Sequence, residues 1–309
     1  MSEPLTDREI IDLLYKYGHF RCPEMGGSPE AGEIRSMAIK DKAVKTALQS
    51  YQEWFADDLD QLCMMVHHRD AVIDGEIGPA TRLLMNLPRC AVPDYPIEEA
   101  ASRNWPKDCR GNITTNYKMT LKGLSQQDIR DLITESHNQW NRAIDVRMRL
   151  DQEAGSNVKI YTQAEDLSGS TLAWSHLARG SCSSRLSQRF DLRRNWSGNM
   201  FITVKTHEDG HALGANHVKD SSATMYPSIN KAARGRRGYP NKTDLQEMDR
   251  IGYKVSGAPT PDPGDPDPRP DPTPWPQPDP GTNWRDVLGK LCTTSNIMAM
   301  LRLIRDLRK

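Results

Sequence analysis

The chain has 309 residues, which is enough for one sizeable core and a smaller second domain. Lysine plus arginine and aspartate plus glutamate both number 41, so no net charge draws the protein to nucleic acid or to an acidic membrane. No run approaches the roughly 18 apolar residues of a membrane-spanning helix. We therefore expect neither a nucleic-acid-binding protein nor an integral membrane protein.

The N-terminal part predicts a small helical domain. Residues 7–20 and 38–66 carry apolar positions three or four apart, which predicts two helices. The segment CPEMGGSPEAGE between them is rich in Gly, Pro and Glu, and it predicts an exposed loop that proteases can cut. The stretch DGEIGPATRLLMNL predicts a turn and a short helix that ends before Pro88. Residues 1–88 are assigned to this domain.

A mixed α and β domain follows, over residues 105–257. TTNYKMTL and DVRMRLDQ alternate in strand fashion around a helix near residues 125–143, and NVKIYTQ predicts a third strand. Residues 258–282 form the next segment, which contains 11 of the 21 prolines and predicts an extended linker. Residues 283–309 predict an amphipathic helix, which either binds a partner or packs back on the preceding domain.

The segment HEDGHALGANH has the spacing of a zinc site. His207 and His211 lie one turn apart on the same face of a helix, so both imidazoles can reach one ion. Gly214 allows the backbone to leave the helix in a left-handed conformation, which brings His217 round as a third ligand. Three histidines leave one position for water, and Glu208 can act as the catalytic base. The pattern predicts one catalytic Zn²⁺.

A helix with a chance pair of histidines is the alternative. Three of the eight histidines fall within this one pattern, however, and the longer pattern with a downstream methionine turn is the metzincin signature. Met225, in the run from Thr224 to Pro227, supplies that methionine and would pack under the metal.

Over residues 7–255 the sequence resembles the matrixins, a branch of the metzincins. PRCAVPD, from Pro88 to Asp94, is similar to their cysteine-switch segment, usually written PRCGVPD. The resemblance implies that Cys90 is the fourth zinc ligand in a latent precursor and that Arg89 pairs with Asp94. Activation would then need cleavage downstream of Cys90, by another protease or by the enzyme itself. The alternative for Cys90 is an ordinary buried thiol.

The resemblance also implies the fold. It is an α+β, zincin-like metzincin domain with a mixed, mostly parallel five-stranded sheet and three helices, preceded by a small all-α propeptide domain. VIDGEIGPAT, from Val72 to Thr81, is similar to the peptidoglycan-binding-like fold of matrixin propeptides. In matrixins this domain serves inhibition, whereas similar modules on bacterial wall enzymes bind peptidoglycan. Residues 89–104 would be the switch segment and the activation linker.

Two stretches depart from the family pattern. Trp174 and Arg189 stand where matrixins have histidines for a second, structural zinc, so we expect no second zinc. His176 is then expected at the surface. Asp191 remains a candidate Ca²⁺ ligand, with few carboxylates near it in the sequence.

A basic segment follows the methionine turn, where matrixins have their specificity-pocket loop. It could favour acidic or polar groups in a substrate, or it could be a solvated loop. The candidate specificity residues are Tyr226, Pro227, Arg234, Arg236 and Arg237.

The six cysteines are scattered without CxxC pairs, which argues against a disulfide framework, and Cys182 has no assigned role.

The leading hypothesis is a latent zinc endopeptidase acting on protein or peptide substrates. One alternative is a hydrolase of bacterial wall peptides tethered by the N-terminal domain. The other is a non-catalytic protein of a virus particle or surface, which the intact Glu208 argues against. The family implies an extracellular or particle-associated location, although the polar, acidic start MSEPLTDREIIDLL does not read as a secretory signal.

Overall fold

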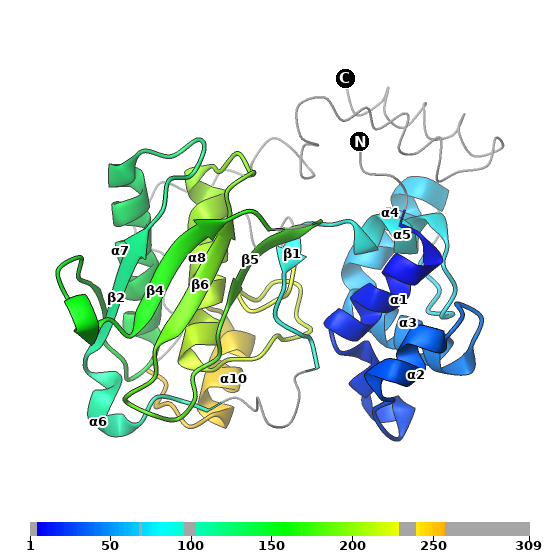
Figure 1. Ribbon diagram of the computed structural model, residues 1–309, viewed down its shortest axis with the longest axis horizontal. Helices are drawn as coiled ribbons and strands as arrows, with labels where there is room; N and C mark the ends of the chain where they lie inside the picture. The colour runs from blue at the N-terminus through cyan, green and yellow to red at the C-terminus, as the bar shows by residue number, and fades with distance from the viewer. Residues whose placement is uncertain (1–4, 68–69, 96–102, 168, 229–238, 257–309) are drawn as a thin grey trace. The chain divides into compact units, whose positions relative to one another are not determined.

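The computed structural model covers two compact units, which divide between Leu87 and Pro88. The predicted linker, residues 258–282, and the predicted C-terminal helix, residues 283–309, lie outside the residues that it describes. No described helix is long and apolar enough to cross a membrane. The described residues, drawn in colour in Figure 1, are 5–67, 70–95, 103–167, 169–228 and 239–256.

Among its described residues, the first unit has helices as its regular elements, joined by loops. Its core is built from buried apolar side chains such as Ile10, Leu14, Val44 and Leu48, which recur at helical spacing. Its elements are α1 (Asp7–Lys16), η1 (His19–Arg21), η2 (Pro23–Met25), α2 (Ala31–Ser36), α3 (Lys42–Trp54), α4 (Ala56–His67) and α5 (Pro79–Met85).

The two long helices predicted here are interrupted in the structure. The helix predicted over residues 7–20 ends at Lys16, because Gly18 takes a left-handed conformation with φ of 84° that only glycine adopts readily. The helix predicted over residues 38–66 is broken at Phe55 into α3 and α4. Apolar periodicity continues across both breaks, so the pattern alone did not reveal them.

The Gly- and Pro-rich segment after α1 is largely exposed, but it is not a continuous loop. It contains η2, and α2 begins at Ala31. The prediction missed α2 because its capping box is made by two glutamates: Glu30 lies at the N-cap, and the Glu33 side chain accepts from the Glu30 backbone N–H at 2.9 Å. Ile34 then anchors this short helix in the core.

The second unit is built on a mixed, mostly parallel sheet in the order β1-β5-β6-β4-β2-β3, with β5 antiparallel to β6 (Figure 1). Five strands were predicted and six are present, because the switch segment adds β1 alongside β5. The strands are β1 (Arg89–Cys90), β2 (Ile113–Lys118), β3 (Met148–Leu150), β4 (Ile160–Glu165), β5 (Thr171–Ser175) and β6 (Leu186–Asp191).

Helices α7 (Gln126–Ala143) and α8 (Gly198–Leu213) pack against each other behind the sheet in the view of Figure 1. A capping box between Ser125 and Asp128 starts α7. The buried indole of Trp140 on α7 donates to the Thr206 carbonyl of α8 at 2.9 Å, which fixes the two helices together. The shorter helices of this unit are α6 (Lys107–Arg110), η4 (Gly155–Asn157) and α10 (Lys242–Arg250).

Two apolar clusters hold this unit. One joins α7, β2 and the end of α8 through residues such as Trp140, Ile113 and Leu213. The other lies under β5 and β6 and includes Phe190 and Phe201. Helix α8 crosses both clusters, which explains why every residue from Phe201 to Leu213 is buried.

Candidate metal centre

Helix α8 carries the first part of the site. The Ser197 hydroxyl caps its start by accepting from the Met200 N–H at 3.2 Å. His207 and His211, four residues apart, project from the same face, and both are buried. Glu208 follows the first histidine and has no exposed surface.

The helix ends at Gly214, where the backbone adopts a conformation that favours glycine. Gly214 has φ of 105°, and a β-carbon there would lie 2.7 Å from the carbonyl oxygen of Arg103. Any other residue would meet both conformational strain and a backbone clash. The turn that Gly214 allows brings His217 back to the helix.

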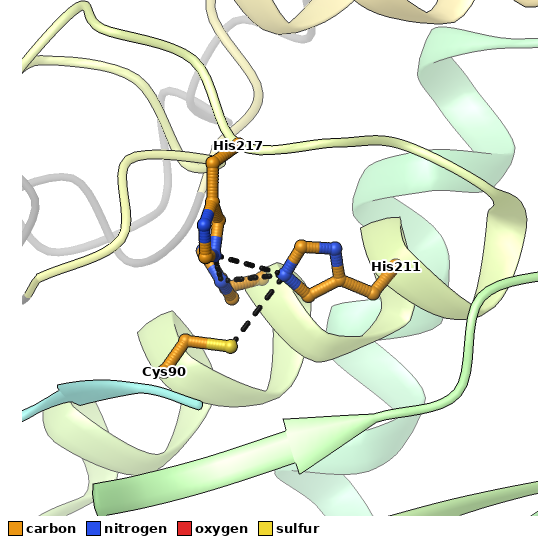
Figure 2. A group of neighbouring side chains, drawn as sticks. Cys90, His211 and His217 are labelled. Carbon is orange, nitrogen blue, oxygen red and sulfur yellow. Dashed lines mark hydrogen bonds between the residues drawn. The ribbon is translucent and has the colours of Figure 1, made fainter. Parts of the chain in front are cut away.

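Four side chains meet at this point. Figure 2 shows Cys90, His211 and His217 converging from three separate segments. The His211 Nε2 atom lies 3.0 Å from Nε2 of His207, 3.1 Å from Nε2 of His217 and 3.5 Å from Sγ of Cys90. The Nε2 atoms of His207 and His217 are 3.3 Å apart. In the described part of the chain, this is the cluster whose donor atoms could hold a metal ion.

The spacing fits a tetrahedral zinc ion. Zinc bonds of about 2.0–2.1 Å to nitrogen and about 2.3 Å to sulfur place the nitrogens roughly 3.3 Å from one another and roughly 3.6 Å from the sulfur. The separations in the structure, 3.0 to 3.3 Å and 3.5 Å, match this arrangement. Three histidines and one cysteine are also ligands that zinc takes in proteins.

The other ring nitrogens explain why a cation belongs there. The Nδ1 atoms of His207 and His211 lie 2.7 Å from the carbonyl oxygens of Thr224 and Ala215, and Nδ1 of His217 lies 2.8 Å from Oδ1 of Asp94. Each Nδ1 must therefore carry the proton and donate it. All three Nε2 atoms then present lone pairs to one another, which repel unless a cation accepts them.

Burial keeps these imidazoles neutral. It lowers the pKa of all three, that of His207 to about 3, with the neighbouring His217 as the next cause. Neutral imidazole is the form that binds zinc.

The switch segment lies in an extended conformation beside β5. Arg89 N–H donates to the Ser170 carbonyl and Ala91 N–H donates to the Ala173 carbonyl, both at 3.0 Å. On the other side, Cys90 N–H donates to the Pro227 carbonyl at 2.9 Å. Cys90 is thus held by main-chain hydrogen bonds on both sides.

An ion pair between Arg89 and Asp94 links the two ends of this segment. Nη2 of Arg89 lies 2.6 Å from Oδ1 of Asp94, and both side chains are buried. The guanidinium Nε also donates to the Cys90 carbonyl at 3.1 Å. These contacts give the segment one shape, with the thiol directed at the histidines.

The Cys90 thiol and the Glu208 carboxyl group are both in an unusual environment. Burial raises the pKa of Cys90 well above its ordinary value, with the nearby Glu208 carboxylate as a second cause. Burial also raises the pKa of Glu208 to about 8, and neither of its carboxylate oxygens has a hydrogen-bond partner among the described residues. A bound cation would offset both effects by favouring the thiolate and the carboxylate.

Met225 packs directly beneath this helix. It has no exposed surface, and a β-carbon on Gly210 would collide with its sulfur. The turn that carries Met225 is fixed by a residue that the sequence did not single out. Asp244 accepts from the backbone N–H groups of Thr224 at 2.9 Å and Met225 at 2.8 Å. The sequence signal for Asp244 was its position. It is the third residue of the helix that follows the N-cap Asn241, where an acidic side chain can complete a capping box.

A buried ion pair on the opposite face of α8 was also missed. Lys205 Nζ donates to the Asp209 carboxylate, and both side chains have no exposed surface. Asp209 also accepts from the Ser136 hydroxyl at 2.6 Å and from the Gln188 amide at 3.1 Å. The spacing of Lys205 and Asp209, four residues apart on a helix, could have revealed the pair.

The two positions that depart from the family pattern bind each other. Trp174 and Arg189 face each other across β5 and β6, with the guanidinium carbon 5.7 Å from the indole centroid. Arg189 also pairs with Glu165 at 3.1 Å. His176, expected at the surface, is half-buried, and its Nδ1 accepts from the Ser187 N–H at 3.1 Å.

The structure does not support Asp191 as a calcium ligand. Its carboxylate is buried and accepts from Arg193 Nε at 3.0 Å and Arg194 Nε at 3.1 Å. Two guanidinium groups already neutralise this charge.

The candidate specificity residues are placed only in part. Tyr226 and Pro227 are buried, and the Pro227 carbonyl holds the switch segment. Arg234, Arg236 and Arg237 lie outside the described residues.

The scattered cysteines argued against a disulfide framework and left Cys182 without a role, but the structure contains a disulfide bond that involves Cys182. Cys109 in α6 bonds to Cys182 in the loop between β5 and β6, with Cα atoms 5.7 Å apart. The partners are 73 residues apart in the sequence, so no local spacing marked them.

The histidine-bearing helix, the glycine turn to His217 and the buried Met225 match the pattern of a metzincin metal centre, here on an α+β domain. A sequence model of the matrixin family matches residues 104–253. This region, just under half of the chain, is thus matrixin-like, and the matrixins are zinc metalloendopeptidases.

Individual relatives are similar at modest identity. The chain is 24% identical to matrix metalloproteinase-C of Caenorhabditis elegans, over 68% of this chain and 36% of that protein. It is 26% identical to matrilysin of Felis catus, over 58% of this chain and 72% of that protein. It is 28% identical to neutrophil collagenase of Homo sapiens, over 50% of this chain and 35% of that protein. The match thus spans about a third of the nematode protein and of the collagenase.

Proposed function

We propose that this protein is a zinc-dependent endopeptidase that cleaves proteins or peptides and is made latent by Cys90. The observation that carries the proposal is the donor set of His207, His211, His217 and Cys90, whose spacing fits one tetrahedral zinc ion. Three neutral imidazoles with one exchangeable fourth ligand are typical of a catalytic rather than a structural zinc site.

Bound zinc would polarise the scissile carbonyl and lower the pKa of a water molecule at the site. The protein supplies the proton transfers. Glu208 stands next to His207 with both carboxylate oxygens unengaged, so it can take a proton from the attacking water and deliver it to the leaving amine. Burial raises the pKa of Glu208, and zinc bound beside it would lower that pKa again, so that the carboxylate form is available to accept the proton.

The substrate would bind where the switch segment now lies. The segment runs as a strand between the edge of β5 and the Pro227 carbonyl, and its backbone bonds to both. An extended peptide can form main-chain hydrogen bonds with the same groups once the segment is gone. Such backbone recognition suits a protease that acts on many sequences.

Latency follows from the position of the thiol. Sγ of Cys90 occupies the fourth side of the histidine cluster, which is where the catalytic water must be. Cleavage in the part of the chain after Asp94 would release the segment. Whether the protein makes this cut itself is a separate part of the proposal.

The test compares the full-length chain with two variants, Glu208→Ala and Cys90→Ser. We expect about one zinc per chain in all three proteins. The parent should cleave a peptide library slowly until a thiol-reactive mercurial is added, and Cys90→Ser should be active without it. Glu208→Ala should keep its zinc and lose at least about 100-fold in rate. Mass spectrometry over time would show whether the parent cuts itself between residues 95 and 105.

Two results would contradict the proposal. A parent chain that binds no zinc would contradict the proposed metal site. Full turnover by Glu208→Ala would contradict the proposed role of the Glu208 carboxylate in proton transfer.

A further inference from the structure

The three zinc-binding imidazoles are not supported in the same way. Nδ1 of His207 and Nδ1 of His211 donate to backbone carbonyls of Thr224 and Ala215, which lie in the protease domain itself. Nδ1 of His217 donates instead to the carboxylate of Asp94 at 2.8 Å. Asp94 belongs to the switch segment, 123 residues earlier in the chain. The segment that blocks the site therefore also supports one of its ligands.

Asp94 is well placed for this role. Its side chain has no exposed surface, and its Oδ1 atom lies 2.6 Å from Nη2 of Arg89 and 2.8 Å from Nδ1 of His217. The carboxylate thus contacts both a guanidinium group and an imidazole. A carboxylate bonded to a metal-binding histidine fixes the orientation of the ring and raises its basicity, and loss of such a partner costs typically about 10- to 100-fold in metal affinity.

We propose that Asp94 is a positioning residue of the metal centre, so that the switch segment holds zinc directly through Cys90 and indirectly through Asp94 and His217. This inference rests on the proposed function. Its consequence is that removal of the switch segment weakens zinc binding by more than loss of the Cys90 sulfur alone would. Removal of the segment would then both open the fourth position and leave Nδ1 of His217 without its carboxylate.

The competing explanation is that Asp94 acts only as the partner of Arg89. In that case its loss loosens the segment, and Cys90 leaves the metal. The two explanations differ in what happens to the sulfur ligand and in whether loss of Arg89 has the same effect as loss of Asp94.

The experiment uses the full-length chain carrying Glu208→Ala, so that no variant cuts itself. Zinc dissociation constants are measured by competition with a chelator for this parent and for Asp94→Ala, Asp94→Asn, Arg89→Met and Cys90→Ser. Each protein is also loaded with Co²⁺, because the thiolate-to-cobalt absorption band reports whether Cys90 remains bound. Thermal unfolding checks that each variant is folded, and Asp94→Asn replaces Asp94→Ala if the latter does not fold.

We expect Asp94→Ala to weaken zinc binding by roughly 10- to 100-fold while the thiolate band persists. Asp94→Asn should fall between parent and Asp94→Ala, because its amide oxygen can still accept from His217. Arg89→Met should have a smaller effect than Asp94→Ala. Unchanged affinity in Asp94→Ala, an effect equal to that of Arg89→Met, or loss of the thiolate band would each overturn the inference.

Failure of the proposed function would look different. If the parent chain bound no zinc, or if Cys90→Ser left both the affinity and the cobalt spectrum unchanged, the metal centre itself would be wrong. Normal zinc and thiolate binding in the parent, with no effect of Asp94, would overturn only the present inference.

Discussion

Met225 occupies the space that a side chain on Gly210 would need. A β-carbon there would overlap the Met225 sulfur and lie 2.9 Å from the ring of Trp140, in a core where both side chains are fully buried. The glycine inside the histidine motif is therefore required by packing, because the methionine turn presses directly against the helix.

Gly210→Ala should destabilise the protein by about 1–3 kcal/mol, because the clash outweighs the gain of about 1 kcal/mol in helix propensity. Denaturant unfolding of the zinc-loaded chain measures this. Gly198→Ala, on the same helix, is the matched control, since its nearest neighbour would be Leu132 at an ordinary 3.8 Å. Equal stabilities for the two variants would contradict the packing argument.

The buried pair of Lys205 and Asp209 should be sensitive to loss of one partner. Lys205→Met leaves the Asp209 carboxylate buried without its cation, and we expect a loss of about 3–5 kcal/mol. Replacing both, as Lys205→Met with Asp209→Leu, should recover most of this loss. A double-mutant cycle in urea measures the coupling, and purely additive effects would show that the pair does not act as a unit.

Asp220 should make the segment between His217 and Met225 sensitive to acid. Burial acts to raise the pKa of its carboxyl, but hydrogen bonds from Thr243, Ser222 and Asn241 outweigh this and lower the pKa to about 2. Because the folded pKa lies below the unfolded value, the stabilisation is present above about pH 4 and is lost as the pH falls towards 2.

Asp220→Ala should therefore lower stability at pH 7 by about 1 kcal/mol, and this difference should shrink near pH 2. Thermal unfolding across this pH range measures it. Asp249→Ala, at an exposed position on α10, is the control and should differ little from the parent at any pH. A difference for Asp220→Ala that does not depend on pH would argue against the hydrogen-bonded carboxylate as its source.

The disulfide between Cys109 and Cys182 should stabilise the protease domain. It closes a loop of 73 residues, so its removal should cost about 2–4 kcal/mol. The double variant Cys109→Ser, Cys182→Ser should melt at the temperature of the reduced parent, and a reducing agent should not lower it further. A parent whose melting temperature is unaffected by reduction would contradict this prediction.

Local spacing placed the central part of the site. His207, Glu208 and His211 lie within five consecutive residues of one helix, and Gly214 determines where that helix ends. The periodicity of a helix and the conformational freedom of glycine are properties of short segments, so the sequence alone could indicate these positions. The resemblance to matrixins then suggested Cys90, which no local rule would have tied to histidines more than 100 residues away.

Only the tertiary structure decided which distant groups meet. It added β1 as a sixth strand, bonded Cys109 to Cys182, engaged Asp191 with two arginines, and placed the carboxylate of Asp94 on His217. Each of these depends on the packing of segments far apart in the chain, where burial sets the strength of the interaction and the fold sets the partner. The sequence by itself indicated the three histidines and Glu208 as a candidate metal site, because their spacing is local, and the fold determined which distant groups surround them.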